Sequence, residues 1–85
     1  MSKKDKLIER LLSRPTDFTF NEASTLLGYF GYLILRAGKT SGSRVTFADR
    51  EKNDYIRLHK PHPRNILKEY QVDDIITALK ERELL

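Results

Sequence analysis

Arg44 and His59 are the residues of this chain whose chemistry stands out first, because together they could stabilise a phosphate and move a proton. Arg44 follows the turn-forming stretch TSGS and opens the strand-like run RVTF. His59 closes a second such run, YIRLH. Arginine only donates hydrogen bonds and keeps its proton, so Arg44 suits charge stabilisation and cannot be a general base. Histidine exchanges a proton near neutral pH, so His59 suits the general base.

The two runs alternate apolar and polar residues, which predicts strands with one buried face. In an antiparallel hairpin, cross-strand partners point to the same face. If Phe47 lies opposite Ile56, then Arg44 lies opposite His59, and residues 50–53 form a loop of common hairpin length. The two candidate residues would then lie beside each other on the polar face.

A register shifted by two residues is the alternative. It would bring Arg57 opposite Arg44 and form the turn from Arg50 and Glu51, which are poor residues for a tight turn. We therefore favour the register that pairs Arg44 with His59. In that register a cation beside His59 favours the neutral imidazole, which is the form that can accept a proton.

A third strand-like run, YLILRAG, precedes the turn, and Leu33 and Leu35 are predicted to face the core together with Val45, Phe47, Ile56 and Leu58. The outward positions of the three runs combine basic and aromatic residues, without an acid: Tyr32, Ile34, Arg36, Arg44, Thr46, Tyr55, Arg57 and His59. Such a face suits a nucleic-acid backbone with unstacked bases. Outward strand positions are polar in most half-buried sheets, so an ordinary solvated face remains the competing interpretation.

The turn and the loop after the third run supply further candidate RNA contacts. Gly42 and Ser43 belong to the turn, where the Ser43 hydroxyl could donate to a phosphate. Lys60 and Arg64 flank the segment PHP. His62 stands three residues after His59, as in some metal sites, but no carboxylate or thiol lies at a useful spacing. We expect no metal and no other cofactor.

Composition limits the class of protein. The chain has 85 residues, a formal net charge of +4, a pI near 9.5 and no cysteine. The absence of cysteine excludes disulfides and thiol chemistry. The basic balance makes nucleic acid the first partner class to consider, although a small lysine surplus is common in soluble proteins. No apolar run resembles a signal or membrane segment, so we expect a cytoplasmic protein that does not bind membranes.

Three helical patterns surround the strands. Residues 3–13 carry four apolar residues on one helical face, Leu7, Ile8, Leu11 and Leu12. A second helix begins at the capping-box spacing of Thr19 and Glu22 and ends at Gly31. A third helix, over residues 70–82, carries a stripe of four apolar residues that we expect to be buried. The order predicts an α+β fold, with a three-stranded antiparallel sheet and helices packed on one face. We expect a single domain over residues 1–85, with an N-terminal helical extension over about residues 1–14.

These segments resemble the HicA toxin family from about Thr19 to Leu79. The resemblance rests on GYFGYLILRAG, SGSRVTF, YIRLHKPHP and LKEYQVDDIITAL as a combination. It implies a double-stranded-RNA-binding-domain-like fold and a type II toxin–antitoxin toxin. Such a toxin binds and cleaves mRNA, arrests translation, and is inhibited by a HicB-like antitoxin protein.

The sequence departs from the family at one position that matters for chemistry. The family pattern resembles Ser-Gly-Ser-His with a catalytic histidine, and this chain has Arg44 in its place. One possibility is that His59 acts as the base while Arg44 stabilises the phosphate charge. A second is an RNA-binding module of the same fold that does not cut. A third is a protein-interaction domain whose basic face docks an acidic protein.

Overall fold

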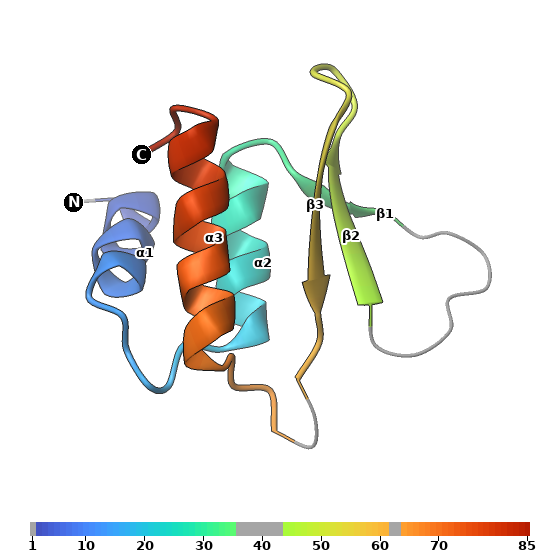
Figure 1. The fold of residues 1–85 in the computed structure, drawn as a ribbon. Helices are drawn as coiled ribbons and strands as arrows, with labels where there is room; N and C mark the ends of the chain where they lie inside the picture. Colours follow the sequence, from blue (N-terminus) through green and yellow to red (C-terminus); the bar gives the residue numbers. More distant parts are fainter. Residues whose placement is uncertain (1, 36–43, 62–63) are drawn as a thin grey trace.

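Three helices and a three-stranded antiparallel sheet make up the fold, as the sequence predicted (Figure 1). The computed structural model describes residues 2–35, 44–61 and 64–85. Its elements in chain order are α1 (Lys3–Leu12), α2 (Phe20–Tyr29), β1 (Leu33–Leu35), β2 (Arg44–Asp49), β3 (Asp54–His59) and α3 (Glu69–Glu81). The last helix therefore begins one residue earlier than its periodicity suggested, which is the usual uncertainty of helix ends.

All three helices lie on one side of the sheet (Figure 1). α2 and α3 lie next to the strands, and α1 lies on their far side, where the fully buried Leu11 packs into the core. The Phe20 ring of α2 meets the Phe47 ring of β2 at a centroid distance of 6.0 Å. Within the described residues no helix covers the other face of the sheet, the open face.

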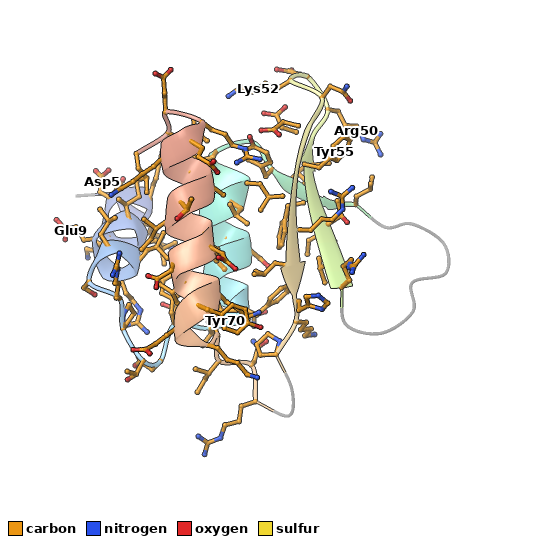
Figure 2. The ribbon with its side chains drawn as sticks, viewed as in Figure 1. Asp5, Glu9, Arg50, Lys52, Tyr55 and Tyr70 are labelled. Atoms are coloured by element: carbon orange, nitrogen blue, oxygen red, sulfur yellow. The ribbon has the colours of Figure 1, made fainter. Side chains whose placement is uncertain are left out.

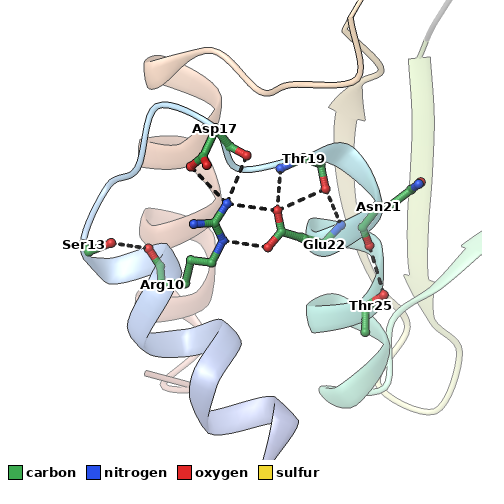
Figure 3. A network of polar contacts seen from close by, with 7 residues as sticks. All are labelled: Arg10, Ser13, Asp17, Thr19, Asn21, Glu22 and Thr25. Atoms are coloured by element: carbon green, nitrogen blue, oxygen red, sulfur yellow. Dashed lines mark hydrogen bonds and ion pairs between the residues drawn. The ribbon is translucent and has the colours of Figure 1, made fainter.

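The first two helices are joined by a polar network that begins with the predicted capping box (Figure 3). Thr19 Oγ1 accepts a hydrogen bond from the Glu22 amide at 3.1 Å, and Glu22 Oε1 accepts one from the Thr19 amide at 3.0 Å. Arg10 of α1 reaches across and donates from Nε to Glu22 Oε2 at 2.6 Å. The hydrogen bond from Arg10 holds the pKa of Glu22 below its ordinary value. α1 is therefore fastened to the start of α2.

One residue of α1 departs from the predicted face. Leu12 was expected to be buried with Leu11, but its side chain is 45% exposed. Leu12 is the last residue of the helix, and it lies about 100° around the axis from Leu11. The apolar face of α1 that packs against α2 and α3 is too narrow to include Leu12.

The strand β1 has the opposite phase from the one predicted. Tyr32 was expected to face outward, but it is 1% exposed, and Leu33 was expected in the core but is 69% exposed. The cause is the exit from α2, where Gly31 adopts a φ of +94° and the Tyr32 amide still donates to the Leu27 carbonyl at 2.9 Å. Tyr32 thus belongs to the end of the helix. When inward and outward positions are counted from Tyr32, the residues of β1 are assigned to the wrong faces of the sheet.

The register confirms this correction. Leu33 pairs with Ala48, Ile34 with Phe47 and Leu35 with Thr46. Because Phe47 is buried in the core, the register places its partner Ile34 on the helix side, where it is still 48% exposed at the edge of the sheet. Leu33, which is 69% exposed, and the half-buried Leu35 are on the open face. The register therefore reverses the predicted face of all three residues, although Ile34 is exposed, as predicted.

A second polar network accounts for the burial of Tyr32. Its hydroxyl donates to Asp54 Oδ2 at 2.6 Å, and the same oxygen accepts from Arg82 Nε at 2.6 Å. These hydrogen bonds, that of Arg82 first, hold the pKa of Asp54 below its ordinary value. Burial, with the bond to Asp54, raises the pKa of Tyr32. The network joins the residue before β1, the first residue of β3 and the residue that follows α3.

The β2–β3 hairpin has the predicted register. Phe47 pairs with Ile56 and Arg44 with His59, so the loop comprises residues 50–53. Asp49 Oδ1 accepts the amides of Glu51 and Lys52 at 3.1 and 3.3 Å and shapes the turn. Asn53 adopts a φ of +54°, a conformation that asparagine tolerates better than most residues. The shifted register with Arg57 opposite Arg44 is excluded.

Candidate nucleic-acid interface

Arg44 and His59 face each other across the two long strands. Arg44 is the first residue of β2, His59 is the last of β3, and the two are cross-strand partners. Both side chains are exposed. Directly paired residues of an antiparallel sheet have Cα atoms about 4.5–5.5 Å apart and point to the same face. The strand ends opposite the hairpin therefore carry a permanent cation beside a titratable base.

A buried glutamine that the sequence reasoning missed holds the backbone of His59. Gln71 is 4% exposed, and its Nε2 donates to the His59 carbonyl at 2.8 Å. Its Oε1 accepts the Lys68 amide at 3.0 Å at the start of α3. The side chain thus ties the end of β3 to the first turn of α3. The sequence did offer one signal for this role. Gln71 is the third residue of the helix, where a glutamine side chain often accepts a hydrogen bond from the residue before the helix.

Arg57 continues the basic row on the open face. It pairs with Thr46, in the next row of the same face toward the hairpin, two residues along each strand from the Arg44–His59 pair. Its side chain is exposed. Among the described residues, neither Arg44 nor Arg57 lies within ion-pair distance of a carboxylate. The described arginines that do have such partners are Arg10, Arg14 and Arg82.

The remaining candidate contacts divide into two groups. Lys60 turns toward the helices, with its ammonium 5.8 Å from the centroid of the Phe20 ring, while Arg64 is exposed on the following loop. Lys60 follows His59 by one residue and so points away from the open face. The predicted contacts Arg36, Gly42 and Ser43, like His62, lie outside the described residues.

The reversed phase of β1 changes the composition of the open face. Two leucines replace the predicted Tyr32 and Ile34, so that the face is apolar near the hairpin and basic at the other end. The cross-strand rows, from the hairpin onward, are Leu33–Ala48–Tyr55, then Leu35–Thr46–Arg57, then Arg44–His59. This gradient was not predicted, because it depends on the phase of β1.

The basic end has the groups that phosphodiester chemistry in RNA requires. A neutral His59 imidazole could take a proton from a hydroxyl, and the Arg44 guanidinium could hydrogen-bond a phosphate bearing increased negative charge. In the described part of the chain, no three histidine, aspartate or glutamate side chains are grouped so as to hold a metal ion.

Comparison of the chain with protein-family models, with curated proteins and with solved structures finds no match. Of the described helices, none is both long and apolar enough to cross a membrane.

Proposed function

We propose that this protein is a HicA-like toxin that binds and cleaves mRNA in the cytoplasm, arrests translation, and is inhibited by a HicB-like antitoxin. The observation that carries the proposal is the pairing of Arg44 with His59 on the open face of the sheet. Arg57, on the same face, adds a further cation without a carboxylate partner among the described residues. The resemblance of residues 19–79 to the HicA family supplies the substrate class and the partner.

In the proposed reaction, His59 accepts the proton of a ribose 2′-hydroxyl as the 2′-oxygen attacks the adjacent phosphorus. Arg44 donates hydrogen bonds to the phosphoryl oxygens while their negative charge increases. The bond from phosphorus to the 5′-oxygen then breaks, and that oxygen takes a proton from water or from the protonated His59. The products are a 2′,3′-cyclic phosphate and a free 5′-hydroxyl, so no metal or redox step is required.

Purified protein and its variants test this reaction on single-stranded RNA. His59→Ala should lower the cleavage rate by about 10²–10⁴-fold, the usual contribution of one acid–base group. Arg44→Ala should also lower it, and Arg44→Lys should restore part of the loss because it returns the charge without the planar fork. His62→Ala is the matched control, because it removes the only other histidine. Circular dichroism verifies that each variant folds.

The substrate offers an independent test of the same mechanism. An RNA with 2′-O-methyl groups has no proton to lose and should remain uncut, although it should still bind. Cleavage of this analogue, or cleavage by His59→Ala at the parent rate, would show that His59 is not the base acting on a 2′-hydroxyl. Growth arrest on expression of the parent, and its absence with His59→Ala, would connect the activity to the cell.

A non-catalytic RNA-binding module is the second candidate function. It is favoured by one specific observation, which is that Arg44 occupies the position of the family's catalytic histidine. In that case the parent binds RNA with a strong dependence on salt, because phosphate contacts release counterions, but it neither cuts RNA nor arrests growth. If the affinity for RNA ignores salt, the basic face instead docks an acidic protein.

The proposed antitoxin partner makes a structural requirement. An inhibitor must cover the face that holds Arg44 and His59, because a substrate has to reach them. The positive charge of this face favours an acidic partner and fast association. A complex that leaves both residues open to solvent would contradict this part of the proposal.

A further inference from the structure

The row of the open face nearest the hairpin is apolar and remains exposed. Leu33 is 69% exposed and Tyr55 is 41% exposed, while Ala48 between them is 5% exposed and forms the floor. Isolated exposed apolar residues are ordinary on a protein surface, but this row continues directly into a basic row. The proposed function uses only the basic part of the face, so the apolar part needs a role of its own.

The position of Tyr55 is fixed by its neighbours. Its hydroxyl donates to Asn53 Oδ1 at 3.1 Å, and its amide donates to Asp54 Oδ1 at 2.9 Å. Asp54 is in turn held by Arg82 and Tyr32. Figure 2 shows Tyr55 and Arg50 toward the hairpin end of the sheet. The Asn53 contact therefore orients the Tyr55 side chain before a flat ligand covers it, which reduces the freedom lost on binding.

We infer that Leu33, Ala48 and Tyr55 form a stacking site for an unpaired base, so that the RNA bound by the open face is single-stranded. A base can stack on an aromatic side chain only when it is not enclosed in a duplex. Tyr55, Arg57 and His59 alternate along β3 on one face, and about 13 Å of strand separates Tyr55 from His59. One RNA strand can therefore contact the apolar row with a base and the basic rows with its phosphates.

Two grooves border the sheet. The groove between β3 and α3 is lined by the acidic Asp74 and Glu81 and by the basic Arg57 and Arg82. The groove along β1 is lined by Leu33 and Ala48, by the basic Arg50 and Lys52, and by the acidic Asp49 and Glu51. Each groove thus combines two acids with two bases, so the inference rests on the exposed Tyr55 and Arg57 and not on the charge of either groove.

Binding of two labelled RNAs, measured by fluorescence anisotropy, tests this inference, which rests on the proposed function. One RNA is a single strand of about ten nucleotides, a typical length for such sites, and the other is a duplex of the same sequence. Both carry 2′-O-methyl groups so that neither is cut. The parent should prefer the single strand, and Tyr55→Ala should weaken its binding by about ten- to a hundredfold. Tyr55→Phe should retain most of the affinity because it keeps the ring.

Matched variants separate stacking from loss of fold and from loss of charge. Tyr70→Ala removes an exposed tyrosine from α3 and should leave binding unchanged. Leu33→Ser alters the same apolar row without touching the Asn53 contact and should also weaken binding. If the duplex binds as well as the single strand, or if Tyr55→Ala and Leu33→Ser bind like the parent, the base site is wrong.

The remaining outcomes distinguish this inference from the proposed function. If Arg57→Gln weakens binding while Tyr55→Ala does not, the proposed RNA interface stands and the base site is rejected. If the parent binds neither RNA, both fail. If the parent self-associates in analytical ultracentrifugation and Leu33→Ser abolishes the association without changing RNA affinity, the apolar row is a protein contact, and the inference is overturned.

Discussion

The arginines on the helix side of the sheet and those on its open face differ in whether they form ion pairs. Between the layers, Arg82 is paired with Asp54, and at the start of α2 Arg10 is paired with Glu22. On the open face, Arg44 and Arg57 have no carboxylate within ion-pair distance among the described residues. The first group joins separate elements of the fold, whereas the second group joins nothing that the structure describes.

This difference assigns different roles to the same residue type. The helix-side pairs are partly screened by solvent, because the side chains of Arg82 and Arg10 are 26% and 36% exposed, so each pair should add a modest amount to stability. An exposed arginine is solvated and needs no partner, so Arg44 and Arg57 can be replaced at little cost to stability. Variants of the first group should therefore alter unfolding, and variants of the second group should alter binding.

The largest expected effect on stability is that of Asp54→Ala. The substitution leaves the buried Tyr32 hydroxyl and the Arg82 guanidinium without their shared acceptor, which should lower the free energy of unfolding by about 1–3 kcal/mol. Urea denaturation followed by circular dichroism measures this loss. Asp74→Ala is the control, because it removes an exposed carboxylate from α3, and its effect should stay within about 0.5 kcal/mol. Equal effects of the two variants would contradict a special role for the Asp54 network.

A smaller loss is expected from changes at Glu22, where two contacts can be separated. Glu22→Ala removes both the capping-box acceptor and the partner of Arg10, and should cost about 1–2 kcal/mol. Glu22→Gln keeps an acceptor for the Thr19 amide and loses only the charge, so its cost should be about 0.2–1 kcal/mol. The same denaturation experiment compares them. If Gln costs as much as Ala, the ion pair with Arg10 outweighs the capping box.

Acid should remove the advantage of the paired carboxylates. The pKa of Asp54 and that of Glu22 are lower in the folded protein than in the unfolded chain, so the unfolded chain binds more protons as pH falls. The stabilisation is complete at pH values above the ordinary pKa values, about 3.9 for aspartate and 4.3 for glutamate. It is lost as pH falls through the lower pKa values that the two groups have in the folded protein. The difference in unfolding free energy between the parent and Asp54→Asn should therefore shrink below about pH 4. A constant difference from pH 7 to pH 3 would contradict this account.

The sequence was sufficient for those features that depend on local patterns. Helical periodicity gave α2 and α3, and the alternation of Val45–Phe47 with Ile56–Leu58 gave the hairpin register and the Arg44–His59 pairing. The phase of β1 could not be read in this way. The hydroxyl of the buried Tyr32 is satisfied by Asp54, which Arg82 holds in turn, and both residues are distant from Tyr32 in the sequence.

The arrangement of residues in the candidate site was also predictable only where it depends on local patterns. Its basic end followed from the hairpin alone, but its apolar end required the face on which Leu33 lies. Gln71 was missed for a related reason, since its importance depends on the carbonyl that it reaches at the end of β3. Features that arise from contacts between segments distant in the chain therefore needed the structure.

The smallest expected effect on stability, and the clearest separation of the two groups, is that of Arg57→Gln. Because the side chain is exposed and has no carboxylate partner among the described residues, unfolding should change by less than about 0.5 kcal/mol. If Arg57 contacts a phosphate, the slope of log affinity against log salt should fall in magnitude by about 1, with weaker binding to all RNA sequences. Lys80→Gln, which removes the same charge from the exposed side of α3, should leave the slope unchanged. Titrations of uncut 2′-O-methyl RNA at several salt concentrations measure both variants. Equal slopes for the parent and Arg57→Gln would mean that this arginine is an ordinary solvated charge and that the contrast between the two groups does not extend to it.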